Sequence, residues 1–392
     1  MLDFSVTEED AAIRDLAHDF AEKEIRPIAP KQEWLQDPAE RFPWAIVEKA
    51  SKLGFRTMTV PKEFGGIDAS FTAMILALEE LAWGDLGVAI IFSTTLAKVK
   101  RIARLGTTEQ KEWFFPRFME NDRYVLSGAT SEPAHGTDTF IAMDTIQLNT
   151  NAKPDGKEWV LNGTKHFINN ANEASLYFVT CTDLSEKNLG GRTVLMVPRD
   201  TPGVKVERVH EKISQRLSNN AEITFSNCRV PIQNELGTAA TREAEVLHFA
   251  MEHNVQAAAM MLGVARAAYE SALEYARNRV QGGKKIIEHQ AIGMMLAEMV
   301  TSLECMDALK FRVTWEAEQS RPNYDLGPMA KYHASEASIK VCLKAAEVLG
   351  GSGIMMELPV QKYVRDSLSA LHYDGTQQAA LIRVMNSLIG GR

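Results

Sequence analysis

The spacing of apolar residues changes twice along the chain and divides it into three segments. From residue 7 to about residue 121, apolar side chains such as Ile13, Leu16 and Phe20 recur every three or four positions, which is typical of amphipathic helices. Between residues 124 and 236 the period falls to two in runs such as "EWVLNGTKHFI", which predicts strands, with a hairpin-like turn at Asn162-Gly163. Long helical segments return after residue 238. The pattern therefore predicts a helical domain at 1–123, a β domain at 124–238 and a helical bundle at 239–392.

Composition narrows the functional classes. The chain has 392 residues, of which 45% are hydrophobic and 24% are charged, so it can bury a large core. A formal net charge of −8 argues against non-specific binding to nucleic acid or to a membrane surface. No apolar run approaches the roughly 18 residues that span a bilayer. We therefore expect a soluble protein without membrane insertion.

The spacing of the cysteines indicates whether the protein is in a reducing or an oxidising compartment. They are far apart in the sequence, form no Cys-x-x-Cys pair, and no charged-then-apolar leader opens the chain. This predicts reduced thiols in the cytoplasm, with neither a disulfide framework nor a metal site. The four residues are Cys181, Cys228, Cys305 and Cys342.

Two short motifs suggest chemistry. In "YDGTQQ", Asp374 precedes Gly-Thr and an amphipathic stretch, so its carboxylate is either a helix N-cap or a functional group at a helix entrance. "LGGSGI" at 349–354 follows a helical pattern and predicts either a plain helix C-cap or a backbone that approaches a phosphate. No Gly-x-Gly-x-x-Gly follows an early strand, which argues against a Rossmann domain.

Six segments, taken in order, resemble motifs of the acyl-CoA dehydrogenase family across essentially the whole chain. The resemblance implies an N-terminal helical domain, a middle β-barrel-like domain and a C-terminal four-helix bundle, usually in a homotetramer. It also implies FAD as cofactor, an acyl-CoA substrate and an electron-transfer flavoprotein as acceptor. The segments are "SEPAHGTD", "LNGTKHFINNA", "RVQGGKKIIEHQ", "VLGGSGI", "PVQKYVRD" and "YDGTQQ".

The family's reaction removes an α-proton from a thioester while a hydride passes from the β-carbon to flavin N5. A carboxylate in a dry pocket suits the first step because desolvation raises its proton affinity. The family has Glu where this sequence has Asp374, which makes Asp374 the candidate base. Some branches carry their Glu at the position aligned with His253, so His253 is a second candidate that acts either as a base or by orienting Asp374.

The resemblance also assigns binding residues. Arg279 and Gln290 fall where one subunit reaches the FAD of its neighbour, and an Arg suits a pyrophosphate through forked bonds. Thr137, Asn254 and Gly375 fall near the substrate. The full set of implied cofactor contacts is Thr130, Ser131, Thr137, Phe167, Asn169, Arg279, Gln290, Glu347, Gly350, Gly351, Thr376 and Gln378.

Several departures from the family pattern bear on the substrate. Asp374 is one methylene shorter than Glu, which withdraws the carboxylate by about an ångström and favours a cyclic or branched acyl group. Phe167 replaces a Trp, Asn169 a Thr, Gly282 a Phe and Glu347 a Gln. Alternatives are a flavin oxidase or monooxygenase resembling nitroalkane oxidases, which use an Asp, an enoyl-CoA reductase, or a non-catalytic relative.

Overall fold

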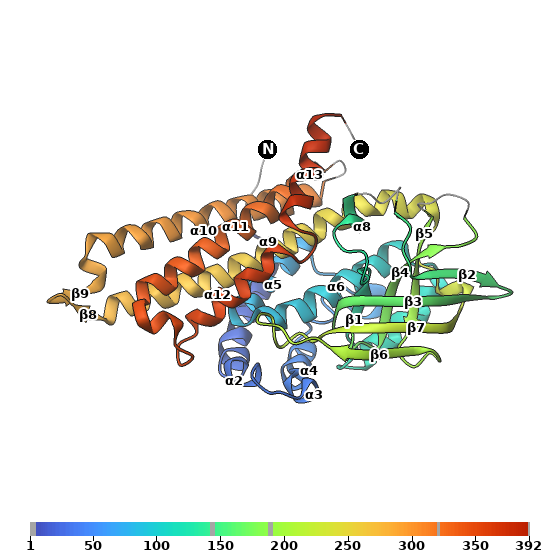
Figure 1. Ribbon diagram of the computed structural model, residues 1–392, viewed down its shortest axis with the longest axis horizontal. Helices are drawn as coiled ribbons and strands as arrows, with labels where there is room; N and C mark the ends of the chain where they lie inside the picture. The colour runs from blue at the N-terminus through green and yellow to red at the C-terminus, as the bar shows by residue number, and fades with distance from the viewer. Residues whose placement is uncertain (1–4, 142–145, 187–190, 320–321, 391–392) are drawn as a thin grey trace.

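The computed structural model describes residues 5–141, 146–186, 191–319 and 322–390, and their elements follow the predicted order of helices, strands and helices (Figure 1). In the N-terminal part, α5 is buried almost throughout, and α6 is N-capped by Asp85, whose carboxylate accepts a hydrogen bond from the Val88 amide. The helices are α1 (Glu8–Phe20), a π-turn at Ala21–Ile25, α2 (Ala29–Gln32), α3 (Pro38–Arg41), α4 (Trp44–Lys52), α5 (Phe71–Gly84), α6 (Leu86–Leu105) and α7 (Thr108–Glu120).

The middle segment forms a curled seven-stranded sheet. Neighbouring strands follow the order β1-β4-β2-β3-β7-β6, and β5 also pairs with β4. Strands β1 and β4 are parallel, whereas β3, β7 and β6 pair antiparallel. The strands are β1 (Leu126–Ala129), β2 (Asn151–Asp155), β3 (Glu158–Asn169), β4 (Leu176–Asp183), β5 (Arg192–Pro198), β6 (Val204–Val209) and β7 (Asn220–Pro231), and the short helix α8 (Asp138–Ile141) follows β1.

The predicted hairpin at Asn162-Gly163 is wrong. Both residues lie inside β3, at a register shift between Leu161 and Gly163 in its pairing with β7. Gly163 is needed for another reason: its φ is +140°, and an added Cβ would lie 2.4 Å from the Thr150 Cα. The turn that joins β2 to β3 instead contains Gly156, at φ +64°.

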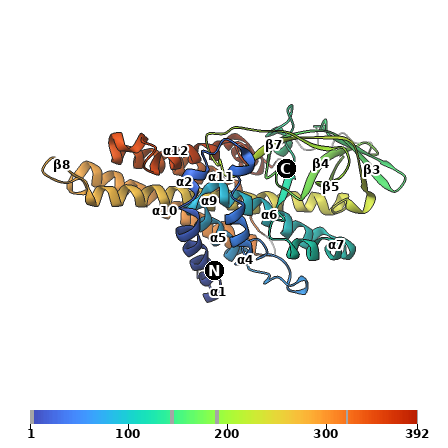
Figure 2. The same ribbon diagram turned by 90° about the horizontal axis from the view of Figure 1, so that it is seen from below.

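The C-terminal segment is a long helical bundle. Its central helix α9 packs against α10 and α11 and also against α5, so it joins the two helical parts of the chain. Figures 1 and 2 show the bundle extending away from the sheet to the β8–β9 hairpin at the opposite end of the molecule. The elements are α9 (Ala239–Asn278), β8 (Val280–Gln281), β9 (Lys284–Lys285), α10 (Gln290–Ala317), α11 (Leu326–Leu349), α12 (Val360–Leu368) and α13 (Gln377–Leu388). Among the described residues, no helix is both long enough and apolar enough to cross a membrane.

Candidate active site

A cleft of about 1980 Å³ lies where the sheet meets α6, α9 and the turn before α13. Its walls come from all three segments of the chain, which explains why no single stretch of sequence could define it. It gathers nine of the residues predicted to act in catalysis or binding. These are Thr130, Ser131, Thr137, Phe167, Asn169, His253, Asn254, Asp374 and Gly375.

Asp374 lies in a strained turn and is not a helix cap. Its φ is +52°, which is uncommon for a residue with a side chain, and Gly375 follows at φ +89°. The N-cap of α13 is Thr376, whose hydroxyl accepts a hydrogen bond from the Ala379 amide at 3.3 Å. The N-cap interpretation of Asp374 is therefore wrong, because the helix begins two residues later. The carboxylate is left to face the cleft.

Three hydrogen bonds fix this turn from different sides. The buried Lys331 ammonium donates to the Gly375 carbonyl at 2.7 Å. The Tyr373 hydroxyl donates to the Ala257 carbonyl on α9 at 3.1 Å, and the Thr376 amide donates to the Thr137 hydroxyl at 3.3 Å. Together these bonds hold an unfavourable backbone conformation at the wall of the cleft.

His253 contacts the candidate base. Its Nδ1 lies 3.6 Å from the Asp374 Oδ1, too long for a good hydrogen bond but close enough for their charges to interact. The side chain of His253 is 17% exposed and that of Asp374 is 32% exposed. Burial lowers the pKa of His253 from its ordinary value of 6.5, against the raising effect of Asp374. His253 is therefore neutral at pH 7.

The proton affinity of Asp374 differs from the expectation. Burial would raise its pKa, but His253, Lys331 and Lys98 together lower it below the ordinary value of 3.8. Desolvation is the largest single effect on this carboxylate, as expected, but the basic groups together outweigh it. Asp374 is thus ionised at neutral pH and can accept a proton.

Residues of the sheet also line the cleft. A second register shift in β3, between Lys165 and Ile168, places Phe167 at φ +58° with 63% of its surface exposed in the cleft. Its ring contacts His166, with centroids 3.9 Å apart. An exposed ring of this size at a bulge suits a flat ligand.

Below that ring, a buried ion pair supports the loop after β1. The Lys165 ammonium donates to the Thr130 carbonyl at 2.8 Å and to the Glu132 Oε1 at 2.9 Å. Glu132 also accepts hydrogen bonds from the Asn149 and Thr150 amides, so its carboxylate is well satisfied. This network places Thr130 and Ser131 at the edge of the cleft.

The donors and acceptors on this wall fit a flavin. Thr130 and Ser131 offer hydroxyls, Phe167 an exposed ring and Asn169 an amide. Asn169 accepts a hydrogen bond from Asn220 at 2.9 Å, while the buried Oδ1 of Asn220 has no hydrogen-bond partner among the residues that the structure describes. An N–H group on a ligand would give this oxygen the hydrogen-bond donor that it lacks.

The remaining predicted cofactor residues do not line this cleft. Arg279 follows the last residue of α9, 26 residues beyond His253, so about 39 Å of helix separates it from the candidate base. Gln290, Glu347, Gly350 and Gly351 lie in the same part of the bundle, whereas Thr376 and Gln378 lie beside the Asp374 turn. The far group therefore cannot touch a ligand in the cleft of its own chain.

Sequence reasoning missed several basic residues that line the cleft, including Lys98, Arg101 and Arg383. A signal was available for the first two: in the largely apolar helix "LGVAIIFSTTLAKVKRIARL", Lys98 and Arg101 follow Thr94 at spacings of four and seven, which places all three on one face. For Arg383 the sequence offered no comparable signal.

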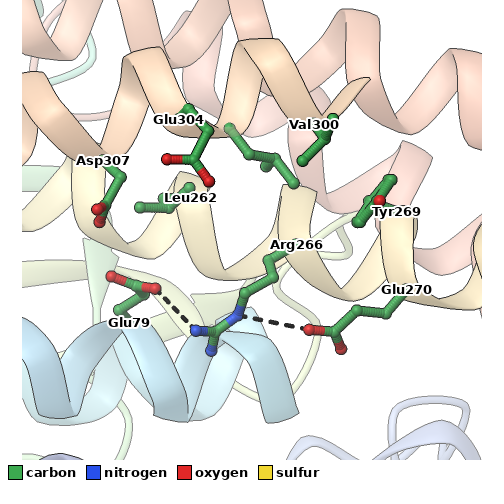
Figure 3. Close-up of a pocket in the computed structure, with 9 residues that line it drawn as sticks. Glu79, Leu262, Arg266, Tyr269, Glu270, Val300, Glu304 and Asp307 are labelled. Atoms are coloured by element: carbon green, nitrogen blue, oxygen red, sulfur yellow. Dashed lines mark ion pairs between the residues drawn. The ribbon is translucent and has the colours of Figure 1, made fainter. Parts of the chain in front are cut away.

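A second hollow, of about 330 Å³, lies between α5, α9 and α10 (Figure 3). Arg266 occupies it, 3.1 Å from a Glu79 oxygen and 3.8 Å from a Glu270 oxygen. Lys310 bonds Glu79 from the other side at 2.6 Å. These ion pairs explain the charged lining as a structural link between helices, and none of the predicted site residues lies there.

Comparisons with known proteins agree along the whole chain. Residues 7–122, 127–228 and 246–389 match the family models of the acyl-CoA dehydrogenase N-terminal, middle and C-terminal domains. An acyl-CoA dehydrogenase of Bacillus subtilis is 32% identical over 394 residues, covering 98% of this chain and 99% of the relative.

Two solved structures share the fold. Butyryl-CoA dehydrogenase from Megasphaera elsdenii has a TM-score of 0.90 at 29% identity and covers 99% of this chain and 100% of its own. Glutaryl-coenzyme A dehydrogenase in its glutaryl-CoA complex has a TM-score of 0.90 at 26% identity and covers 100% and 97%.

Proposed function

The chain belongs to the acyl-CoA dehydrogenase family, and so is an FAD-dependent oxidoreductase acting on acyl-CoA; within that activity, we propose that Asp374 is the base that removes the α-proton. One observation carries the proposal. The Asp374 carboxylate, on the turn before α13, lines the same cleft as Thr130, Ser131 and Phe167 of the sheet segment. A base on one side of the bond and an acceptor on the other is what the reaction requires.

In the proposed mechanism, an Asp374 oxygen takes the α-proton as the Cα–H bond breaks, and that electron pair forms the Cα=Cβ double bond. When bound, FAD accepts the hydride that leaves the β-carbon. His253 restrains the carboxylate from behind, and the hydrogen bonds of Lys331, Tyr373 and Thr376 keep the turn in place. Phe167 and Asn169 would contact the flavin when it is bound, and Thr137, Asn254 and Gly375 would contact the thioester.

Asn254 has a specific part in this proposal. It is 3% exposed, lines the cleft beside His253, and its Nδ2 has no hydrogen-bond partner within the described part of the chain. A buried amide donor without a partner is costly, so a ligand carbonyl or hydroxyl is expected to accept from it.

The substrate and partners follow from the family and from the shorter base. A cyclic or branched acyl group would bring its α-carbon nearer to Asp374 than a straight chain does. The proposed acceptor is a separate electron-transfer flavoprotein, and the proposed assembly is a homotetramer in which Arg279 and Gln290 reach the FAD of a neighbouring subunit. Their distance from the cleft of their own chain supports that arrangement.

An anaerobic titration tests the activity. FAD-loaded protein is mixed with linear, branched and alicyclic acyl-CoA thioesters while the flavin absorbance is followed. We expect at least one saturated thioester to bleach the flavin, and reoxidation to need the carrier flavoprotein. Rapid oxygen consumption without a carrier would instead identify an oxidase. Reoxidation of the reduced protein by enoyl-CoA, without bleaching by any saturated thioester, would instead identify an enoyl-CoA reductase.

A further inference from the structure

We propose that the acyl group of the substrate carries a carboxylate, which binds to Lys98 and Arg101 on α6. The inference deepens the proposed function, on which it rests, by naming the chemical class of the acyl group. It begins from three residues on one face of α6, Thr94, Lys98 and Arg101, which all line the cleft that contains Asp374. A pocket built only for a hydrocarbon chain would be expected to present apolar side chains at this helix face.

The fold makes room for Lys98. Its residue is 5% exposed, and its side chain lies against the backbone of β1 at Gly128. A Cβ added to Gly128 would lie 2.6 Å from the Lys98 Cε and 2.9 Å from its Nζ, so only glycine at this strand position leaves space for the side chain. The ammonium group is therefore enclosed between helix and sheet at the wall of the cleft.

Several basic side chains surround the Asp374 carboxylate. Lys98, Lys331 and Arg383 all interact electrostatically with Asp374, and His253 contacts it. Lys98 and Arg101 lie close enough to repel each other. Glu245 also lines the cleft, but its carboxylate is bound by Arg104 in a forked pair. Among the described residues, the charged groups that act on Asp374 are thus basic, which favours an anionic ligand beside it.

Burial makes the charged form of Lys98 unfavourable. Burial, with a contribution from Arg101, lowers the pKa of Lys98 from 10.5 to about 7. A buried ammonium under such a penalty is stabilised when an anion enters and forms charge-assisted hydrogen bonds. A substrate carboxylate would also offset the positive charges that lower the pKa of Asp374.

Two thioesters of equal length test the proposal: glutaryl-CoA, which ends in a carboxylate, and pentanoyl-CoA, which ends in a methyl group. The FAD-loaded wild type should reduce its flavin with a kcat/KM about 10- to 100-fold higher for glutaryl-CoA, the worth of one charge-assisted hydrogen bond. Lys98→Met should remove most of that preference, and Lys98→Arg should keep it. Lys100→Met is the matched control, because Lys100 is on the same helix but outside the cleft.

Distinct results would overturn the inference. If the wild type prefers pentanoyl-CoA, the acyl group is neutral although the dehydrogenase proposal stands. If Lys98→Met slows both thioesters equally, Lys98 acts on the base or on the reacting thioester and not on a distal carboxylate. If neither thioester nor any other in the panel bleaches the flavin, the proposed function and this inference fail together.

Discussion

At the scale of single residues, the site depends on the Asp374 carboxylate, which does not cap the helix that follows it. Asp374 has a left-handed backbone conformation, and the cap of the following helix is supplied by Thr376. Three hydrogen bonds from other elements maintain that conformation. Strain kept in this way at a cleft wall points to a functional role for the side chain.

His253 provides a pH test of the pair. Its pKa lies below 6.5 because burial and Lys98 favour the neutral ring more than Asp374 and Glu252 favour the charged one. The ring is therefore neutral at pH 7 and gains its proton only below pH 6.5. A protonated ring beside Asp374 weakens the base further, which slows removal of the α-proton. We expect kcat/KM to show an acid limb that falls below pH 6.5.

The variant His253→Gln should lose that acid limb, since the pKa of Asp374 itself lies below 3.8 and cannot produce it. Stopped-flow flavin reduction between pH 5 and pH 8 provides the measurement. Identical pH profiles for the variant and the wild type would contradict the proposed coupling between the two side chains.

The sequence could predict Asp374 and His253 as separate candidates but not their contact. They are 121 positions apart in the chain, and only the packing of α9 against the turn before α13 brings them together. Lys331 escaped prediction for a similar reason. A single lysine on an amphipathic helix indicates a solvated face unless the tertiary structure buries it.

At the scale of elements, periodicity predicted the helices and strands well and the local irregularities poorly. The two-residue period through β3 was correct, but the Asn-Gly pair within it indicated a turn where the strand continues through a bulge. The bulge near Phe167 was not predicted either. Bulges depend on the partner strand β7, which no local pattern contains.

The crossing of α5 and α9 offers an element-scale prediction. At Gly263 the two helices are in backbone contact, since an added Cβ would lie 2.2 Å from the Glu79 carbonyl oxygen and 2.9 Å from the Trp83 nitrogen. Gly263→Ala should therefore destabilise the protein by about 1–3 kcal/mol or more and lower the thermal midpoint by several degrees.

The matched control is Gly293→Ala in α10. The nearest atom to an added Cβ there is the Ile287 carbonyl oxygen, at 3.9 Å. With free space and a better helix former, this variant should be neutral or more stable by up to about 1 kcal/mol. Equal thermal midpoints for both variants would contradict the close helix contact.

At the scale of the whole molecule, the predicted cofactor residues fall into two groups at opposite ends of the bundle. One group lines the cleft with Asp374, and the other lies near the β8–β9 hairpin with Arg279 (Figure 1). Exposed apolar residues on α13 and beyond it are consistent with contact between copies of the chain. They are Leu381, Met385, Leu388 and Ile389.

Subunit mixing tests whether the two groups meet between chains. Asp374→Asn and Arg279→Met should each be inactive or nearly so. When the two variants are co-expressed and hybrids are purified through two affinity tags, one site of each two-fold pair combines an intact Asp374 with an intact Arg279. We expect about half of the wild-type activity to return. Hybrids that stay inactive would show that Arg279 does not serve the neighbouring site.

The most direct test of the account is the rate of anaerobic flavin reduction by the best thioester in Asp374→Asn, with Asp374→Glu as its control. We predict that the Asn variant keeps its FAD and still binds the thioester, but reduces its flavin about a thousandfold more slowly or worse, since a general base contributes about 10²–10⁴-fold. The Glu variant, which keeps a carboxylate, should retain measurable reduction. An Asn variant within tenfold of the wild type, together with a His253→Gln variant that is inactive, would contradict the assignment of Asp374 as the base.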